Sequence, residues 1–217
     1  MATDNFNRAD TATNAGRGAN WTAVSGFSAN INTNQSSGNA NGDPALAYYN
    51  AITPGTSQYA QIVLETNAGA NPLETQPDGG NGPAVYVQTG ADSGYLIQCN
   101  TQAAQRFQLI RRIAGANTVI ATYNAVAPVD GDIVRLEVEI VGGDPVLDLL
   151  VNGSSVGSPF PFTDTDGAAL TSGRVGDYGL VVNELFRWDD WEGGDLAPAA
   201  QLIPDADYLL YMHTQRW

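Results

Sequence analysis

The sequence predicts an all-β protein, built as a single antiparallel β-sandwich with a C-terminal extension. Short segments of alternating apolar and polar residues recur between turn signals from residue 48 onward, and no stretch of helical period appears before residue 196. The chain has 217 residues, of which 43% are hydrophobic and 15% charged, so it can bury one sizeable core and is too apolar to be disordered. We therefore place the sandwich at residues 1–196 and the extension at residues 197–217.

The expected strands follow one another along the chain. Residues 1–45 are rich in Asn, Gly, Thr, Ala and Ser, and we expect extended chain and loops around a first strand there, because Phe6, Trp21, Phe27 and Ile31 need burial. Further strands are expected at residues 58–65, 84–88, 95–100, 106–113, 118–123, 133–141, 146–151 and 175–182.

Alternation is clearest in residues 133–141. One face carries Val134, Leu136, Val138 and Ile140, and the other carries Arg135, Glu137 and Glu139. The pair Asn152-Gly153 predicts a hairpin turn, because a type I′ turn needs positive φ at both central positions. Asp130-Gly131 predicts another turn, and residues 71–83 are expected to be a polar loop rich in Gly and Pro.

Charge and composition exclude several classes of function. The chain has 23 acidic and 9 basic residues, a net charge of −14, and no lysine. This balance argues against binding to nucleic acid or to an anionic membrane, since both need a cationic surface. A single cysteine excludes an intrachain disulfide and a cysteine-based zinc site, and a single histidine, His213, excludes a histidine-rich metal centre. Cys99 alternates with Tyr95 and Ile97, so we expect it in the core.

Both ends of the expected sandwich carry motifs of a known family. Residues 4–8 (DNFNR), with Trp21 and Thr22 following, resemble the opening strand of concanavalin A-like (laminin-G/laminarinase-like) jelly-roll domains. Residues 188–196 (WDDWEGGDL) resemble the closing strand of these domains, which pairs with the opening one. The family's Gly-Leu-Gly turn before the Trp is replaced here by residues 15–19 (AGRGA).

The resemblance implies more about fold than about function, because this architecture hosts many functions. Chains with this opening and closing pattern resemble virion proteins of tailed bacteriophages, notably minor tail and capsid-associated proteins, and also bacterial carbohydrate-binding proteins. The first interpretation implies a non-enzymatic structural or adhesive protein of a phage particle, bound to other virion proteins or to copies of itself and in weak contact with cell-surface glycan. The alternative is a free, secreted carbohydrate-binding module, and a glycoside hydrolase comes third.

The resemblance also implies a candidate calcium site. Concanavalin A-like domains often hold a structural calcium with an acid of the closing strand and backbone near the opening strand. Asp190, with Asp4 opposite, corresponds to that arrangement. The alternative is that both acids satisfy turn amides and face solvent. Calcium takes about six to eight oxygen ligands, and the sequence identifies only a few of them.

Glu137 and Glu139 are the best candidates for a catalytic pair of carboxylates. Residues two apart on a strand share a face at a spacing of about 6.5–7 Å, and glycosidases place two carboxylates at about that separation. The E-x-D-x-x-E pattern of laminarinase-like enzymes is absent, however, and Arg135 on the same face keeps both carboxylates ionised, which does not suit a general acid. We therefore expect a solvated strand face with one Arg-Glu pair, and no enzyme.

Two further patterns have simple explanations. Residues 164–167 (DTDG) are acid-rich like a calcium loop but lack the EF-hand spacing, so we expect a solvated turn. Several tyrosines would stack on sugar rings if they were exposed, although alternation places some of them in the core, and no carbohydrate site is assigned. These tyrosines are Tyr48, Tyr49, Tyr86, Tyr95 and Tyr123.

The extension is too apolar for a solvated tail. Its apolar and aromatic residues form a predicted docking face, made of Tyr208, Leu209, Leu210, Tyr211 and Trp217. Two arrangements stay open: the extension folds back on its own domain, or it clamps a neighbouring subunit. His213 lies among these aromatic residues, where a packing role is expected.

Overall fold

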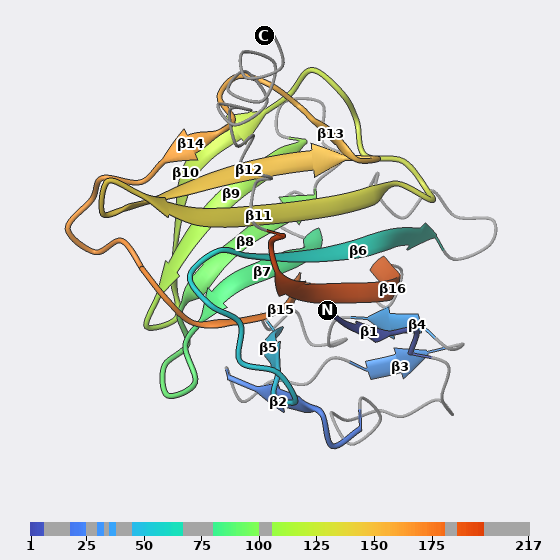
Figure 1. The fold of residues 1–217 in the computed structure, drawn as a ribbon. Helices are drawn as coiled ribbons and strands as arrows, with labels where there is room; N and C mark the ends of the chain where they lie inside the picture. The colour runs from blue at the N-terminus through green and yellow to red at the C-terminus, as the bar shows by residue number, and fades with distance from the viewer. Residues whose placement is uncertain are drawn as a thin grey trace, which may run out of the picture.

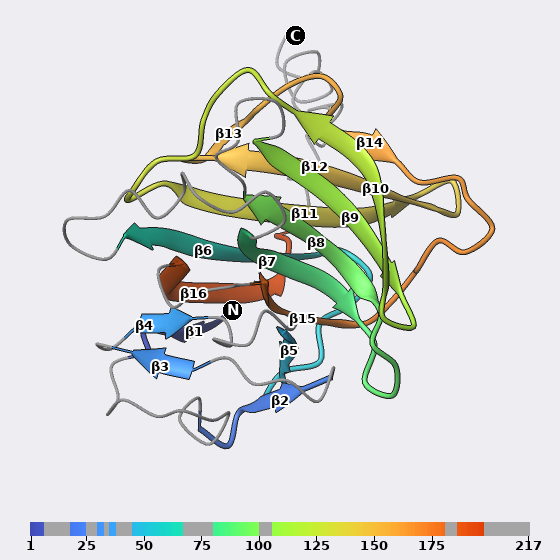
Figure 2. The same ribbon diagram turned by 180° about the vertical axis from the view of Figure 1, so that it is seen from behind.

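The computed structural model describes residues 1–6, 18–24, 30–32, 35–37, 45–66, 80–99, 106–180 and 186–197. Within these ranges every regular element is a β-strand, and the strands form two antiparallel sheets packed face to face (Figures 1 and 2). The all-β sandwich expected from the alternation is confirmed. The described residues include no helix long and apolar enough to span a membrane.

One sheet has nine strands in the described part of the chain, with the order β13-β12-β11-β6-β16-β4-β3, while β1 lies beside β16 and β14 beside β12. These strands are β1 (Ala2–Asp4), β3 (Asn30–Asn32), β4 (Gln35–Ser37), β6 (Gln58–Thr66), β11 (Ile133–Val141), β12 (Asp144–Val151), β13 (Ser154–Ser155), β14 (Phe162–Thr163) and β16 (Phe186–Asp195). In β11, Val134, Leu136 and Val138 are buried while Glu139 is exposed. The alternation predicted for this strand is confirmed.

The other sheet has seven strands over the same described ranges, in the order β10-β9-β8-β7-β15-β5-β2. They are β2 (Trp21–Ala23), β5 (Ala45–Tyr49), β7 (Gly80–Val87), β8 (Gly94–Cys99), β9 (Phe107–Ile113), β10 (Ala116–Tyr123) and β15 (Arg174–Leu180). The strands β7 and β8 are buried along their whole length. Ile97 and Cys99 pack into the main core between the sheets, as predicted for Cys99, whereas Leu96, Ile110 and Tyr178 belong to a second apolar cluster.

The first and last described strands lie side by side, as the family motifs imply. The strand β1 pairs with β16, with Ala2 opposite Gly193 and Asp4 opposite Trp191. Next to this pair, aromatic rings from both sheets contact one another. The ring centroids of Trp21 and Trp191 are 4.9 Å apart, and Tyr49 stacks on Trp191 at 5.0 Å. Aromatic pairs add stabilisation beyond their buried area, so this cluster joins the two sheets at the chain ends.

The structure confirms the hairpin predicted at Asn152-Gly153 and corrects the loop predicted for residues 71–83. Asn152 and Gly153 have φ values of 51° and 78° and connect β12 to β13, so that hairpin is confirmed. The loop predicted for residues 71–83 is wrong at its end, because β7 begins at Gly80. A Cβ at Gly82 would lie 1.7 Å from the carbonyl oxygen of Ile97. Glycine at this position therefore serves close strand packing rather than a turn.

The predicted docking extension is almost wholly outside the described residues. Only Ala197 is described, so Tyr208, Leu209, Leu210, Tyr211 and Trp217 lie outside, as does His213. Their docking role stays a prediction, and so does the domain boundary after residue 196.

Candidate functional site

A polar hollow of about 680 Å³ opens where the first and last strands of the sandwich meet. It is lined by Thr3, Asp4, Asn5, Asn20, Tyr49, Gln61, Val63, Ile133, Asp190, Trp191 and Glu192. Three of these residues carry carboxylates and three carry amides, and they come from segments far apart in the sequence. Pockets of about 300–1,000 Å³ with a few convergent polar groups are typical small-molecule sites. We call this feature the terminal hollow.

Asp4, at the edge of the terminal hollow, stabilises the fold through two hydrogen bonds. Its Oδ1 accepts a hydrogen bond from the Phe6 backbone N–H at 2.9 Å, and its Oδ2 accepts one from the Trp21 indole Nε1–H at 2.7 Å. Asp4 is buried, and Phe6 has a φ of 48°. Charge-assisted hydrogen bonds of this kind are about twice as strong as neutral ones. Asp4 therefore fixes the chain as it leaves β1 and ties it to β2 in the opposite sheet.

Asp190 lies in a β-bulge of β16. Asp189 pairs with Val63 and Glu192 pairs with Gln61, so β16 has one more residue here than β6. Asp190 has a φ of 44° and is exposed. A non-glycine residue in this left-handed region costs about 1–2 kcal/mol, and bulges often redirect a side chain beside a functional site. The bulge sets the carboxylate of Asp190 at the terminal hollow.

Glu192 is held in place on the outward face of the nine-stranded sheet. It lies between Thr3 and Gln61 in register, and residues opposite one another in a sheet share a face. The Tyr59 hydroxyl donates a hydrogen bond of 2.5 Å to Glu192 Oε1, and the guanidinium of Arg135 covers the Tyr59 ring at 3.7 Å. Burial, followed by the hydrogen bond to Glu192, raises the pKa of Tyr59 to about 12. A neutral phenol therefore orients this carboxylate at neutral pH.

The aromatic residues of the terminal hollow form a wall rather than a stacking platform. Trp191 is fully buried, and its Nε1–H donates to the Gly176 carbonyl at 3.0 Å. Tyr49 is also buried, and its hydroxyl accepts a hydrogen bond from Asn20 Nδ2 at 3.1 Å. Two other tyrosines considered for sugar stacking, Tyr86 and Tyr95, are fully buried. Only Tyr48 and Tyr123 of the five keep partial exposure.

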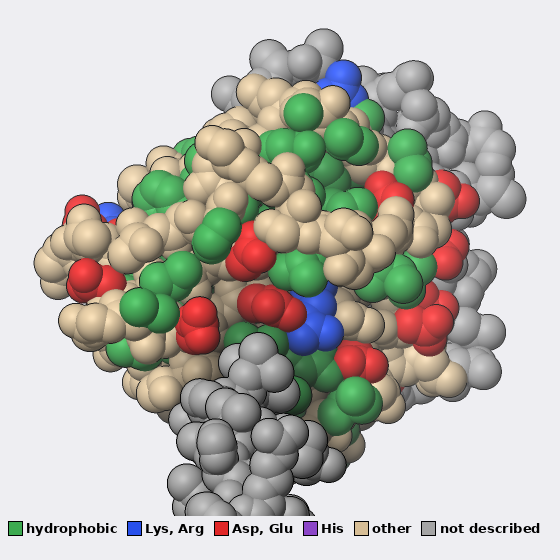
Figure 3. Space-filling model, turned by 45° about the horizontal axis from the view of Figure 1, so that its top comes forward, with side chains coloured by type: hydrophobic (Ala, Val, Ile, Leu, Met, Phe, Trp, Pro, Cys, Tyr) green, Lys and Arg blue, Asp and Glu red, His purple; other side chains and the backbone are tan. Residues whose placement is uncertain are grey.

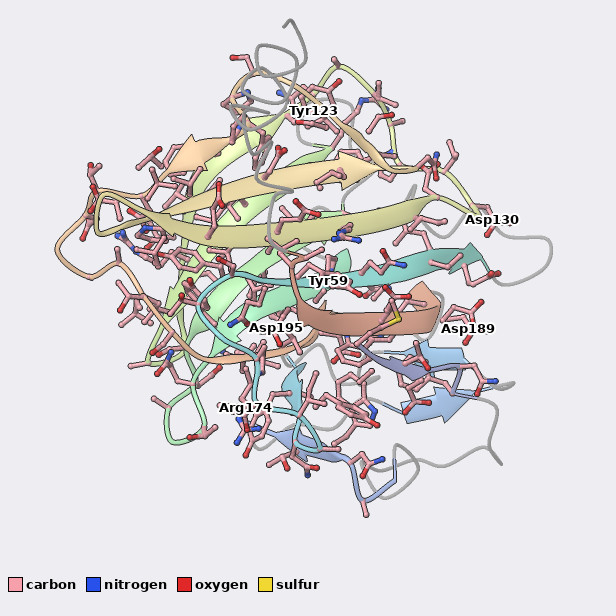
Figure 4. All side chains as sticks on the ribbon, in the orientation of Figure 1. Tyr59, Tyr123, Asp130, Arg174, Asp189 and Asp195 are labelled. Carbon is pink, nitrogen blue, oxygen red and sulfur yellow. The ribbon has the colours of Figure 1, made fainter. Side chains whose placement is uncertain are left out.

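The sheet end beside the terminal hollow is strongly acidic. Burial raises the pKa of Asp189, with the charges of Asp190 and Asp4 acting in the same direction. Burial also raises the pKa of Glu65, with contributions from the charges of Asp130, Asp189 and Asp190. Figure 4 places Asp130 and Asp189 at the same end of the nine-stranded sheet. These carboxylates act on one another, so the potential here is negative.

The two predicted calcium ligands are brought together, but with few further donors. Asp4 and Asp190 line the same hollow, although both carboxylate oxygens of Asp4 already accept hydrogen bonds. Within the described residues there is no group of three or more His, Cys, Asp or Glu side chains placed to hold a metal ion. Calcium takes about six to eight oxygens, so the donors present do not make a calcium site by themselves. Calcium at Asp4 and Asp190 stays a prediction.

The predicted carboxylate pair lies away from the terminal hollow. Glu137 and Glu139 lie beside a separate hollow of about 330 Å³, and the register places Asp148 directly opposite Glu137. Arg135 Nε is 2.7 Å from Glu137 Oε1, while Glu139 is exposed. The solvated strand face with one Arg-Glu pair is therefore confirmed. A third acid, Asp148, was missed because cross-strand neighbours cannot be recognised from spacing along the chain.

The solvated turn predicted at residues 164–167 is wrong for Asp164, which is buried. Arg111 Nη1 lies 2.9 and 3.0 Å from the two carboxylate oxygens of Asp164, and the Tyr95 hydroxyl donates to Oδ2 at 2.7 Å. Arg111 also pairs with the exposed Asp166 at 3.0 Å. A hydrogen bond from the Ala168 backbone N–H, followed by that from Arg111, lowers the pKa of Asp166. Arg111 therefore binds both carboxylates of this acid-rich turn.

Comparison with known proteins shows the fold and no family. No family model and no curated protein sequence matches this chain. Among solved structures, the chain is similar to the exoplasmic/lumenal domain of VIP36 in a Ca²⁺/Man-bound form, with 8% identity, a TM-score of 0.50, and 93% of this chain and 94% of that domain covered. It is similar to a xylan β-1,4-xylosidase from Bacillus halodurans C-125, with 12% identity and a TM-score of 0.50 over 90% of this chain and 39% of the enzyme.

A legume lectin-like domain from Entamoeba histolytica is also similar, with 11% identity, a TM-score of 0.48, and 82% of this chain and 91% of that domain covered. At identities this low the likeness concerns the fold alone. The concanavalin A-like jelly-roll architecture implied by the opening and closing motifs agrees with the VIP36 domain and the matched part of the xylosidase.

Proposed function

We propose that this chain is a carbohydrate-binding β-sandwich domain that holds a glycan in the terminal hollow. The observation that carries the proposal is the convergence of three carboxylates and three amides on one hollow of about 680 Å³. Sugar hydroxyls both donate and accept hydrogen bonds. Carboxylates accept such bonds, while Asn and Gln side chains do both. A hollow of this lining therefore matches the chemistry of a saccharide better than that of an apolar ligand.

The terminal hollow also offers a small apolar surface for one side of a sugar ring. Ile133 is exposed, Val63 is half-buried, and the register places these two residues directly opposite one another on β11 and β6. The C–H groups of a pyranose would pack on this pair, while Asp190 and Gln61 would accept from its hydroxyls. The mannose-bound VIP36 domain and part of the xylosidase share the architecture. Their likeness supports the proposal through the fold only.

A binding role is favoured over a catalytic one. Glu137 Oε1 lies 2.7 Å from Arg135 Nε, so this carboxylate is engaged in an ion pair rather than free to act on a substrate. Two of the three carboxylates at the terminal hollow are likewise engaged: Asp4 holds Phe6 and Trp21, and Glu192 accepts from Tyr59. Groups held this firmly suit recognition, because they lose little freedom when a ligand binds.

The test is a glycan array with the full chain, followed by calorimetric titration of each glycan that binds. Gln61→Ala should weaken binding about tenfold, because it removes a side chain that both donates and accepts hydrogen bonds in the hollow. The matched control is Asp144→Asn, which removes one carboxylate at the hairpin end of β11, about 25–27 Å along that strand from Ile133. Absence of binding to every glycan at millimolar concentration would contradict the proposal, as would equal losses in the control.

Assembly into a tailed-phage particle is a second candidate, and it rests on the sequence. Its support is the apolar composition of residues 197–217, most of which lie outside the described part of the chain. Light scattering of the full chain and of a version ending at Leu196 tests it. An oligomer that becomes a monomer on truncation supports assembly, whereas two stable monomers argue for a free binding module.

A further inference from the structure

The charge of the terminal hollow narrows the class of sugar that it would accept. Its lining contains three carboxylates, Asp4, Asp190 and Glu192, and no lysine, arginine or histidine among the described residues. We propose that the hollow prefers cationic amino sugars, such as short oligomers of glucosamine, over neutral and anionic sugars. This inference rests on the proposed function, because it names the ligand class of the same site.

The carboxylates and the amides of the hollow would bind different groups of an amino sugar. Asp190 is exposed at the bulge, so its carboxylate can approach an ammonium group without prior desolvation. Asn20 is also exposed, and with Gln61 it offers amide groups for the remaining hydroxyls. A charge-assisted hydrogen bond from an ammonium to a carboxylate is stronger than one from a hydroxyl. The same carboxylates repel the carboxylate of a uronic or sialic acid.

The acidic surroundings extend beyond the hollow itself. The pKa values of Glu65 and Asp189 are raised by burial and by the neighbouring carboxylates, which reflects a local excess of negative charge. Figure 3 shows acidic side chains at the centre of the face turned to the viewer, where a basic side chain lies beside them, and along its left-hand and right-hand edges. Clefts lined by one sign of charge concentrate ligands of the opposite sign.

The arginines on this sheet do not cancel that charge. Arg135 is paired with Glu137 and covers the Tyr59 ring, so its cation is engaged beside the hollow rather than in it. The register places Arg187 opposite Glu65, at the far side of the bulge from Glu192, and its side chain lies outside the described part. Among the side chains that the structure describes at this sheet end, Arg135 is the cation nearest to Asp189, Asp190, Glu192 and Glu65, so this described part keeps a negative balance.

The experiment compares three trisaccharide-length probes of matched size: a glucosamine oligomer, its N-acetylated neutral form, and a uronic acid oligomer. Calorimetric titration with the full chain is run at pH 6, at low and high salt, with EDTA in one arm and added calcium in the other. We expect the glucosamine oligomer to bind at least tenfold more tightly than the neutral form at low salt, and the uronic acid oligomer not to bind. High salt should reduce the preference, because it screens exposed charges.

Two variants and one control probe distinguish the hollow from the general acidity of the chain. Asp190→Asn should weaken the glucosamine oligomer about fivefold, the effect of losing one exposed ion pair, and leave the neutral form within a factor of two. Asp144→Asn, an equal change of charge elsewhere, should alter neither. A trilysine peptide of similar charge should bind more weakly than the glucosamine oligomer, because it lacks hydroxyls for Asn20 and Gln61.

The outcomes separate this inference from the proposed function. Equal binding of neutral and cationic oligomers, or binding of trilysine as tight as that of glucosamine, overturns the preference while sugar binding itself stands. Binding that needs calcium and shows no preference for the amine overturns it as well. If no oligomer binds, the proposed function and this inference fail together. A preference that Asp190→Asn reduces about fivefold and Asp144→Asn leaves unchanged supports it.

Discussion

Replacing Asp4 by alanine should destabilise the whole sandwich, although Asp4 is only the fourth residue of the chain. The substitution removes the acceptor for the Phe6 backbone N–H and for the Trp21 indole N–H, and both donors come from buried residues. Hydrogen bonds to a charged group contribute about 1.5–3 kcal/mol each. Two effects of the substitution offset part of this loss of folding free energy. The buried carboxylate no longer has to be desolvated, and Phe6 can leave its positive φ of 48°. We expect a net loss of about 3 kcal/mol.

Urea unfolding followed by tryptophan fluorescence measures this loss, because Trp21, Trp188 and Trp191 are buried. Asp190→Asn, at the same hollow but exposed and with a side chain that tolerates the φ of 44° at this position, is the control and should change the free energy of unfolding by about 0.5 kcal/mol or less. In the Trp21→Phe background, Asp4→Ala should cost at least about 1 kcal/mol less, since the shared hydrogen bond is already gone. A loss below about 1 kcal/mol in the native background would refute the reasoning. So would a loss that appears with calcium and vanishes in EDTA, which would make Asp4 a metal ligand.

Three further predictions concern other buried or partly buried groups. Arg111→Met should cost about 3–5 kcal/mol in urea unfolding, because it leaves the buried carboxylate of Asp164 without its cation; an unchanged midpoint would contradict this. Burial raises the pKa of Tyr86 to about 12, so stability should fall as pH rises from about 10 to 12, and the fall should be smaller in Tyr86→Phe, as measured by thermal melting. Glu65 and Asp189 have raised pKa values in the folded state, so stability should rise as pH falls from neutral through those values; Glu65→Gln and Asp189→Asn should be more stable at pH 7 and lose this rise.

The sequence predicts the parts of the fold that depend on local pattern. The strand at residues 133–141 is recognisable because one of its faces is buried and the other is wet, which makes period-two alternation visible. The start of β7 at Gly80 is not recognisable in this way, since that strand is buried on both faces and begins with small and polar residues. A glycine that permits close strand approach and a glycine in a turn look the same in the sequence.

Long-range pairing explains what the sequence does not predict about the site. Asp4 and Asp190 were linked by the motifs at the two chain ends, and the structure does place both at one hollow. Gln61 and Glu192 carry no motif of their own and become partners only through the register of β6 and β16. Asp164 pairs with Arg111, which lies 53 residues away in the sequence. Because the local sequence of the acid-rich turn contains no sign of this partner, the turn could not be distinguished from a solvated loop.

Asp4 connects the stability of the sandwich to the chemistry of the terminal hollow. Its carboxylate lines the hollow and also holds Phe6 and Trp21. A ligand that binds this carboxylate therefore also affects the stability of the junction between the two sheets. A ligand of the folded state raises its stability by RT ln(1 + [L]/Kd). A glycan present at a hundred times its Kd would therefore add about 2.7 kcal/mol, close to what Asp4→Ala removes. Loss of binding in an Asp4 variant would for this reason reflect unfolding as much as recognition. The exposed Asp190, whose removal leaves the junction intact, is the residue on which binding has to be judged.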